Sequence, residues 1–304
     1  MTDPSAVAEY VRARRADVDA ALANLLPSPP ECPAPVADAM RYSLTAGGKR
    51  LRPVLCLASA EAVGGDRAAV LPAACAIELI HTYSLIHDDL PAMDDDSLRR
   101  GLPTLHVVAG EGMAILAGDG LLTEAFHVLS KLPGDPVRVL RAVRLIAEAA
   151  GPVGMVGGQA IDLACVTPDP QGRTAPPLDA GGLSTMHAKK TGALIRAAAT
   201  AGAVLGGGAE PQIAAIDRAA AEFGLAFQIV DDILDVEGDS AQLGKTTGKD
   251  AAAGKPTYPA LYGLDQSRRM ASDCIARARS VLSAANLGDS WLLGIGRWIV
   301  ERRN

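Results

Sequence analysis

Residues 216–235 read IDRAAAEFGLAFQIVDDILD, and their periodicity predicts a long amphipathic helix. Apolar side chains recur at alternating steps of four and three residues, which places them on one stripe along the helix. The stripe comprises Ile216, Ala220, Phe223, Phe227, Val230 and Leu234. On the neighbouring face, Gln228, Asp231, Asp232 and Asp235 follow i, i+3, i+4, i+7 spacing. The helix therefore pairs one apolar side with one amide-and-carboxylate side.

Residues 87–96, HDDLPAMDDD, form a second acidic block at the end of another apolar run. The run from about Leu71 to Asp89 is apolar nearly all round, which predicts a buried helix. Pro91 lacks an N–H group and should end this helix near Asp89. The first carboxylates then lie at a helix C-terminus, where the partial negative charge of the helix dipole adds to their attraction for cations.

Crowded carboxylates repel one another, and some protonate unless cations neutralise them. Mg²⁺ binds through one or two carboxylates and leaves positions open for phosphate oxygens. Asp231 and Asp235 lie one turn apart on one face, which suits a shared metal. A single Asp-Asp pair is more often a helix cap, and calcium buffering would need a Gly-punctuated twelve-residue loop that the chain lacks. Two blocks on separate apolar helices instead predict one diphosphate held between several metal ions.

A cationic segment, GGKRLRP at residues 47–53, precedes the first acidic block. Because Arg52 precedes Pro53, we expect it to be non-helical, and Pro53 to open the next helix. Arginine side chains and backbone N–H groups at a helix start form a ready anion site. The further cationic or polar candidates are Arg99, Arg100, Lys190, Thr191, Lys245 and Lys255. Any one of these residues could be an ordinary solvated surface residue. Their positions beside the acidic blocks instead predict a second anion pocket.

His81 lies seven residues before Asp88, and so nearly on the same helix face. It is either a phosphate donor or a satisfied core residue, and the sequence leaves both open. The sequence contains no nucleophile elbow, P-loop or dinucleotide-binding glycine motif. Gly157-Gly158-Gln159 is at most a close-packing or turn signal. The chain thus has groups for binding anions and metals but no evident nucleophile, which fits reactions in which diphosphate is the leaving group.

The composition favours a soluble helical protein. Hydrophobic residues make up 49% of the 304 residues but aromatic residues only 3%, so the core consists mainly of small and aliphatic side chains typical of packed helices. A net charge of −6 argues against nucleic-acid binding. Five cysteines without a Cys-x-x-Cys pair fit a reducing cytosol. The polar N-terminus and the lack of an uncharged apolar stretch of about 20 residues predict a cytoplasmic protein without a membrane span.

Strand signals are weak, and helical patterns continue on both sides of the one extended Pro/Gly-rich loop, Thr167 to Gly182. We therefore predict an all-α fold, with residues 1–304 forming a single domain.

Several ordered motifs give this chain a specific resemblance to the trans-isoprenyl diphosphate synthase, or polyprenyl synthetase, family, most like bacterial farnesyl and geranylgeranyl diphosphate synthases. The resemblance runs from about Ala46 to the C-terminus. It rests on the 47–53 segment, the long first acidic block with Arg99-Arg100 behind it, Ile115–Asp119, Lys190–Gly192, Phe227-Gln228 with the second block, residues 245–259 and the basic tail. It implies an isoprenoid-synthase-type helical bundle around a central cavity.

The resemblance also implies a chain-elongating prenyltransferase and assigns roles to residues. Three Mg²⁺ ions, with Mn²⁺ as an alternative, would be held by Asp88, Asp89 and Asp94 on one side and by Asp231, Asp232 and Asp235 on the other. The allylic diphosphate would meet Arg99, Lys190 and Lys245, and isopentenyl diphosphate would meet Lys49, Arg52, Arg100 and His81, with Arg50 nearby. Gly48, Thr191 and Gln228 complete the substrate-binding set, and Asp88, Asp94, Asp231, Lys190 and Lys245 the catalytic set. A homodimer is implied as well.

Product length in this family depends on bulky residues below the first acidic block. Ser84 is small and lies on the face of Asp88, whereas Tyr83 lies about 140° round the helix from Asp88. By resemblance, an aromatic residue here with the long acidic block implies a C15 product, farnesyl diphosphate. Core packing of Tyr83, a C20 geranylgeranyl product and a catalytically silent partner subunit are the alternatives. A terpene cyclase would not need the second diphosphate site.

Overall fold

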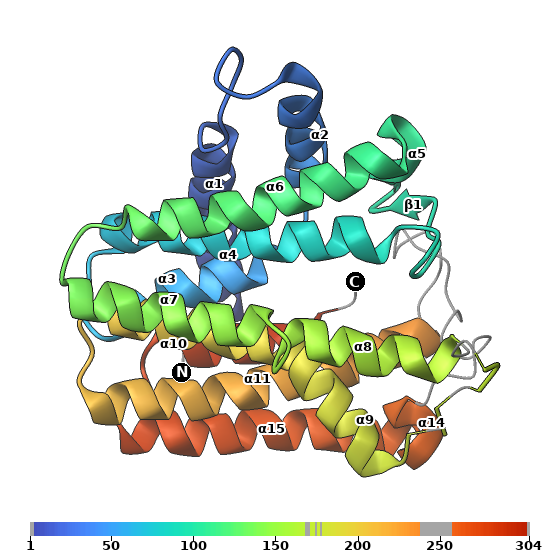
Figure 1. The fold of residues 1–304 in the computed structure, drawn as a ribbon. Helices are drawn as coiled ribbons and strands as arrows, with labels where there is room; N and C mark the ends of the chain where they lie inside the picture. Colours follow the sequence, from blue (N-terminus) through green and yellow to red (C-terminus); the bar gives the residue numbers. More distant parts are fainter. Residues whose placement is uncertain (1–2, 168–170, 174, 177, 238–256, 303–304) are drawn as a thin grey trace.

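The computed structural model describes residues 3–167, 171–173, 175–176, 178–237 and 257–302, and over these the chain is a bundle of helices (Figure 1). The predicted all-α fold is confirmed. The helices are α1 (Pro4–Ala23), α2 (Ala34–Thr45), α3 (Leu51–Ala62), α4 (Arg67–Asp88), α5 (Leu105–Ala109), α6 (Glu111–Ser130), α7 (Pro136–Ala150), α8 (Met155–Val166), α9 (Ala180–His187), the π-helix η1 (Ala188–Gly192), α10 (Ala193–Leu205), α11 (Glu210–Glu237), α14 (Tyr258–Tyr262), α15 (Leu264–Ala284) and α16 (Trp291–Glu301).

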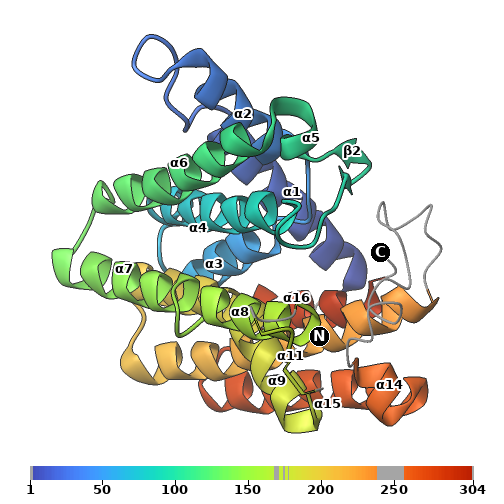
Figure 2. The same cartoon turned by 45° about the vertical axis from the view of Figure 1, so that its right-hand side comes forward.

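The two helices predicted from their apolar patterns form where expected. α11 contains the whole stretch from Ile216 to Asp235, and α4 ends at Asp88 with Asp89 as its C-cap. Because the residues after α4 turn away before Pro91, the first acidic block continues into a loop, as its proline requires. The C-terminal ends of α4 and α11 lie on the same side of the bundle, at the right in Figure 1 and turned forward in Figure 2.

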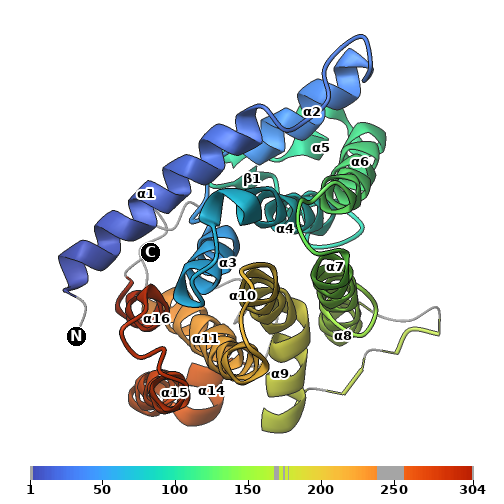
Figure 3. The ribbon, with the colours of Figure 1, turned by 90° about the vertical axis from the view of Figure 1, so that its left-hand side faces the viewer.

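In the described part of the chain, the buried apolar side chains form two hydrophobic clusters. One gathers side chains of α2, α4, α6 and α7, and the other those of α11, α15 and α16. α3 and α10 contribute to both clusters and lie between α4 and α11 when the bundle is viewed along its helices (Figure 3). A Cβ atom on Gly202 of α10 would lie 2.0 Å from the carbonyl oxygen of Cys56 on α3, so this glycine permits the close crossing that joins the clusters. The shared helices support the predicted single domain, which stays a prediction.

α1 lies across the outside of the bundle, with its first half beside α16 (Figure 3). Tyr10 stacks on Trp291 with ring centroids 4.6 Å apart, and its hydroxyl donates to the Glu61 carboxylate at 2.8 Å. Arg14 donates to the same carboxylate at 3.2 Å. These contacts fix one face of α1 to α3 and α16.

Two local expectations differ from the structure. Arg52 is helical, because α3 begins at Leu51, one residue before it, rather than at Pro53. A proline in the first turn costs no hydrogen bond, since those N–H groups have no intrahelical acceptor, and Arg50 with φ of 50° supplies the turn that starts the helix. A short antiparallel ribbon, β1 (Leu98–Arg99) and β2 (Leu102–Pro103), also forms, closed by the positive φ values of Arg100 and Gly101.

Among the residues that the structure describes, two helices, α4 and α6, are long and apolar enough to cross a bilayer by length and composition alone. Buried core helices pass the same test, and α4 has 67% of its most apolar window buried inside the bundle. The expected absence of a membrane span stays a prediction.

Candidate active site

A cavity of about 870 Å³ opens between α1, α3, α4, α11 and α16. It brings together residues from both halves of the chain that the sequence singled out. Among its lining residues are Gly48, Lys49, Arg50, Arg52, His81, Arg99, Arg100, Thr191, Gln228, Asp231 and Asp235. A central cavity in a helical bundle was expected, and its charged lining makes it a candidate active site.

The glycine turn before α3 shapes one wall of the cavity. Gly47 and Gly48 have φ values of 85° and 128°, which side chains rarely tolerate. A Cβ on Gly48 would lie 2.6 Å from Nη1 of Arg100, and the Arg100 guanidinium donates to the carbonyl oxygen of Gly47. Gly48 therefore lets a cation from the β1–β2 ribbon pack directly against the turn that carries Lys49.

Arg50 points into the protein. Its guanidinium donates to Asp19 at 2.8 Å, to Glu78 at 2.8 Å and to the carbonyl oxygen of Leu44 at 2.7 Å. Glu78 is 1% exposed, and sequence reasoning missed it although a lone acid in the apolar run of α4 was a signal for a buried ion pair. These bonds show Arg50 holding the turn to α1, α2 and α4, while its role beside a diphosphate stays a prediction.

Arg52 and His81 supply hydrogen-bond donors to the cavity. Arg52 is 8% exposed, and its Nε atom is buried without a hydrogen-bond partner among the described residues. Burial lowers the pKa of Arg52 to about 10, so its guanidinium remains charged at neutral pH. Burial and the nearby charges of Arg52 and Arg100 hold the pKa of His81 well below its usual range, so its ring is neutral. A buried guanidinium nitrogen without a hydrogen-bond partner is costly, which favours an anionic ligand here.

The first acidic block lies beside this cavity rather than in its lining. Burial, opposed by the charge of Lys190, raises the pKa of Asp88 to about 6. Asp89 is 4% exposed and accepts hydrogen bonds from Nε of Arg99 at 2.7 and 2.9 Å. Asp94 is exposed, and its N–H donates to the carbonyl oxygen of Asp88 at 2.8 Å, which brings the loop back over the end of α4. Asp88 and Asp94 are thus open to a ligand while Asp89 is held by an arginine.

The second acidic block has two carboxylates at the cavity and one turned to the protein. Asp231 and Asp235 line the cavity, and Asp231 accepts a hydrogen bond from Arg302 at 2.7 Å. Asp232 is 6% exposed and accepts the backbone N–H of Tyr258 at 2.9 Å, which ties α11 to the start of α14. Sequence reasoning named the basic tail but missed this contact of Arg302 with the acidic face of α11.

The π-helix η1 positions Lys190 and Thr191. Lys190 Nζ lies 2.6 Å from Oδ2 of Asp162, a buried residue of α8 that the sequence reading overlooked. A Cβ on Gly158 would lie 2.1 Å from the backbone nitrogen of Lys190, so the close-packing interpretation of Gly157-Gly158-Gln159 is confirmed for Gly158. π-Helical turns are frequent at functional sites, and this one presents Lys190 toward Asp88, whose pKa its charge lowers.

The predicted chain-length residues lie on α4 below the first acidic block. Tyr83 is 8% exposed within the first hydrophobic cluster, and its ring meets the ring of His87 edge-on with centroids 5.7 Å apart. The hydroxyl of Ser84 donates to the carbonyl oxygen of His81 at 2.9 Å. Burial and the charge of Asp88 raise the pKa of Tyr83, so its phenol lies within electrostatic reach of Asp88. Lys245 and Lys255 fall outside the described residues.

The donor set of the two acidic blocks fits Mg²⁺. It consists of carboxylate oxygens, the hard ligands that this ion prefers, and the raised pKa of Asp88 reflects burial without a full counter-charge. Within the described ranges, no three His, Cys, Asp or Glu side chains are already gathered around one point. The metal-ligand roles predicted for Asp88, Asp89, Asp94, Asp231, Asp232 and Asp235 stay predictions.

Comparison with known proteins identifies the family. Residues 33–285 match the family model described as polyprenyl synthetase. The chain is 44% identical to a farnesyl diphosphate synthase of Geobacillus stearothermophilus over 97% of this chain and 98% of that protein, and 48% identical to the heterodimeric geranylgeranyl pyrophosphate synthase large subunit 1 of Arabidopsis thaliana over 90% and 73%. The crystal structure of a Helicobacter pylori geranyltransferase complexed with magnesium and isoprenyl diphosphate has a TM-score of 0.82 at 30% identity, covering 99% of this chain and 97% of that one. This chain belongs to the polyprenyl synthetase family.

The raised pKa of Asp88 predicts that, without added metal, the free energy of unfolding depends on pH. Its pKa is about 6 in the folded state against 3.8 for an ordinary aspartate, so between these values the folded state binds more protons than the unfolded state. The free energy of unfolding therefore falls as pH rises through this window. Asp88→Asn should remove that slope and raise the free energy of unfolding at pH 7 by up to about 3 kcal/mol.

Urea-induced unfolding in EDTA at several pH values measures both effects. Asp273→Asn, on the exposed face of α15, is the matched control and should keep the wild-type slope. A wild-type slope in Asp88→Asn would show that the carboxyl of Asp88 does not titrate in this window.

Proposed function

We propose that this polyprenyl synthetase is a short-chain trans-prenyltransferase that condenses isopentenyl diphosphate with dimethylallyl and geranyl diphosphates to give farnesyl diphosphate and diphosphate. The charged cavity is the observation that most strongly supports this proposal. It joins a cationic wall, with the unpaired Nε of Arg52, to the acidic face of α11, and the end of α4 lies beside it. This arrangement suits two diphosphates, one bound by cations directly and one bound through carboxylate-held ions.

The cationic wall would take isopentenyl diphosphate. Lys49, Arg52 and Arg100 supply positive charge, and the neutral ring of His81 can donate one hydrogen bond to a phosphate oxygen without adding a charge. Gly48 lines the cavity, and its lack of a side chain lets the Arg100 guanidinium lie beside the turn. Arg50 would act indirectly by holding this turn against Glu78.

The acidic side would take the allylic diphosphate. Bound Mg²⁺ would neutralise the negative charge that develops on the departing diphosphate. Asp88, Asp94, Asp231 and Asp235 would hold the ions, and Lys190 would place its ammonium between Asp162 and the ligand. Arg99, Thr191 and Gln228 line the same cavity and can donate to phosphate oxygens. Asp89 and Asp232 would serve mainly by anchoring Arg99 and Tyr258.

The reaction needs no protein nucleophile. The allylic C–O bond breaks and its electron pair leaves with the diphosphate, which forms an allylic cation. The double bond of isopentenyl diphosphate attacks this cation to form the new C–C bond. A proton then leaves the resulting cation to the released diphosphate, which restores a double bond. The apolar side chains below the end of α4 would keep water from the cations.

Product length is the less constrained part of the proposal, since similar proteins are named as geranylgeranyl and as farnesyl synthases. Tyr83 favours the C15 product. Its bulky ring lies one and a half turns below Asp88, is nearly buried, and is braced edge-on by His87. A growing chain that runs down α4 would meet this ring before it reached the deeper part of the cluster.

Incubation with Mg²⁺, isopentenyl diphosphate and dimethylallyl diphosphate tests the reaction, with product alcohols resolved by chain length after dephosphorylation. A dominant C15 alcohol is expected. Asp88→Ala and Asp231→Ala should each lower kcat/KM by about 100-fold or more, because each removes charge stabilisation at the leaving group. Asp273→Ala is the control. Unchanged rates in both variants would contradict the carboxylate mechanism, and no metal-dependent product from any allylic primer would favour the silent-subunit alternative.

Tyr83→Ala tests the chain-length role separately. Removal of the ring opens space below Asp88, so the main product should shift from C15 to C20 or longer. Tyr83→Phe, which keeps the ring and loses only the hydroxyl, should retain the C15 product. The distribution of alcohols reads out both variants, and an unchanged distribution in Tyr83→Ala would assign Tyr83 to core packing alone.

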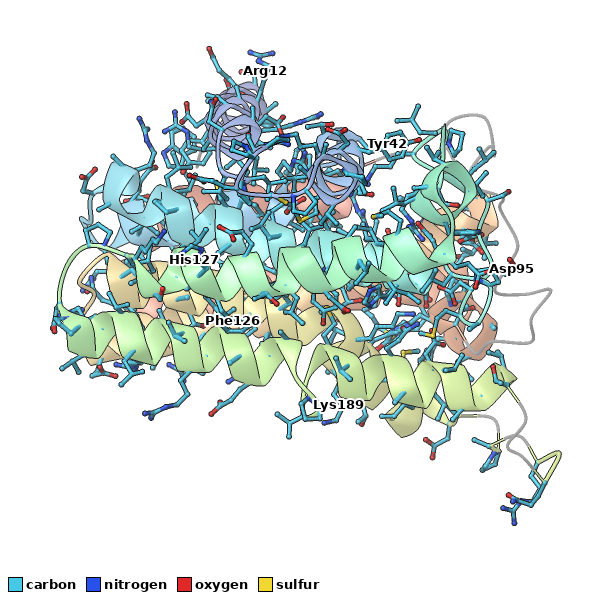
Figure 4. All side chains as sticks on the ribbon, turned by 45° about the horizontal axis from the view of Figure 1, so that its top comes forward. Arg12, Tyr42, Asp95, Phe126, His127 and Lys189 are labelled. Atoms are coloured by element: carbon cyan, nitrogen blue, oxygen red, sulfur yellow. The ribbon has the colours of Figure 1, made fainter. Side chains whose placement is uncertain are left out.

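The proposed homodimer would form through α5, α6 and α7. Exposed apolar side chains gather on these helices, with Val107, Val108, Ile115, Leu116 and Leu140 each at least 44% exposed. Figure 4 shows α6 and α7 together on the face turned to the viewer, with Phe126 and His127 on α6. A patch of this kind marks an interaction site. The Arabidopsis relative is named as the large subunit of a heterodimer, so that protein pairs with another subunit. For this chain we propose a second copy as the occupant, because the family resemblance implies a homodimer.

Sedimentation equilibrium should give twice the chain mass of 31.2 kDa. Leu116→Glu should shift the protein toward the monomer, because a carboxylate would be buried against an apolar surface. Leu261→Glu, at an exposed apolar position of α14, should leave the mass unchanged. A monomeric wild type would contradict the dimer.

The cytoplasmic location stays a prediction, as the Arabidopsis relatives are named chloroplastic.

A further inference from the structure

Arg302, the residue that follows α16, reaches into the candidate active site. Its Nη2 donates to Oδ1 of Asp231 at 2.7 Å and to the carbonyl oxygen of Phe227 at 2.8 Å. The guanidinium lies 3.9 Å above the centre of the Phe227 ring, a favourable cation–π distance. The end of the last helix is therefore tied to the acidic face of α11 through one arginine.

The contacts of Arg302 leave part of its guanidinium unused. Its side chain is 2% exposed, and Nε and Nη1 are buried with no hydrogen-bond partner among the described residues. Arg302 also lines the cavity. Only Nη2 of the guanidinium has acceptors among the described residues, Oδ1 of Asp231 and the carbonyl oxygen of Phe227. Each of the two unpaired buried donors costs free energy, which weakens the hold of Arg302 on this position.

The pairing differs from the other arginine–aspartate pair of the site. Asp89 has a side-chain exposure of 5% and meets Arg99 through both of its oxygens. Asp231 has a side-chain exposure of 39% and meets Arg302 through Oδ1. Solvent, and a cation arriving from it, can reach Asp231 but not Asp89. Only the pair at Asp231 is open to exchange.

A divalent cation and Arg302 cannot both occupy Asp231 at low cost. Two positive centres within a few ångströms repel strongly in a partly buried site. We propose that Arg302 is an internal counter-ion of Asp231 which a divalent cation must displace, so that metal binding to α11 is coupled to release of the end of α16. This inference rests on the proposed metal-holding role of Asp231. Coupling between two ligands of one site is reciprocal. Because the metal displaces Arg302 from Asp231, Arg302 in its bound position must weaken metal binding.

Binding of Mn²⁺ alone tests the exchange without any turnover. The free Mn²⁺ signal in electron paramagnetic resonance gives the bound fraction for the full chain. Arg302→Gln should tighten Mn²⁺ binding about fivefold, the equivalent of about 1 kcal/mol for a partly exposed ion pair. Arg302→Lys keeps the charge but loses the planar stacking over Phe227, so it should tighten binding by a smaller factor.

Arg297→Gln is the matched control, because it removes the same charge from α16, the helix that Arg302 follows, at a position outside the cavity lining. Its Mn²⁺ affinity should equal that of the wild type. Circular dichroism and thermal unfolding check that each variant is folded, and if Arg302→Gln does not fold, the affinity of Arg302→Lys decides.

Unchanged or weaker Mn²⁺ binding in the folded Arg302 variants would overturn the proposal and leave Arg302 as a structural tie. Equal tightening in Arg297→Gln would also overturn it, because the effect would then be one of net charge. Failure of the proposed function has a different signature, since the wild type would make no metal-dependent product whatever the Mn²⁺ affinities of the variants.

Discussion

Repulsion between clustered like charges is the constraint on which the rest of this site depends. The chain places two acidic blocks and a cationic segment around one cavity in a helical protein, where charges are expensive to bury without partners. The charged groups of the site differ in how well the protein pairs them. Asp89 is paired with the opposite charge of Arg99 and Arg50 with that of Glu78, while Asp232 accepts a hydrogen bond from the backbone N–H of Tyr258. Asp88 is left with a pKa of about 6, so its charge is the least compensated.

This division separates groups that hold the site together from groups that can act on a ligand. Residues whose hydrogen bonds are satisfied by the protein, such as Arg50 and Asp232, fix the glycine turn and the start of α14. Residues with an unpaired hydrogen-bond donor, such as Arg52 with its Nε, can still bind a ligand. Positioning of the second group relies on close backbone packing. Gly48 admits Arg100, and Gly158 admits the π-helix that carries Lys190.

Much of the fold and part of the site could be predicted from the sequence, for identifiable reasons. The helix containing Asp231 could be predicted because its apolar stripe and carboxylate face share one period, and the end of α4 because Pro91 fixes it. The partners of the charges could not be predicted. Glu78, Asp162 and Arg302 lie 28 to 71 residues from the groups they contact, and a single sequence carries no signal of such long-range pairing. The helical state of Arg52 was missed for a local reason, since the left-handed turn at Arg50 begins α3 earlier than the proline rule suggests.

The charge of Asp88 also acts on the proposed chain-length residue. Tyr83 lies below Asp88 on α4, and the pKa of its phenol is raised by burial and by that carboxylate. A buried aromatic ring next to an undercompensated charge is held in place by packing against His87, which itself fits against α6 only because residue 118 is a glycine; a Cβ there would lie 2.2 Å from the His87 ring. The position of the ring thus follows from how closely α4 and α6 approach. If Tyr83 limits the product, then the α4–α6 packing, more than the ring alone, sets the depth at which a growing chain stops.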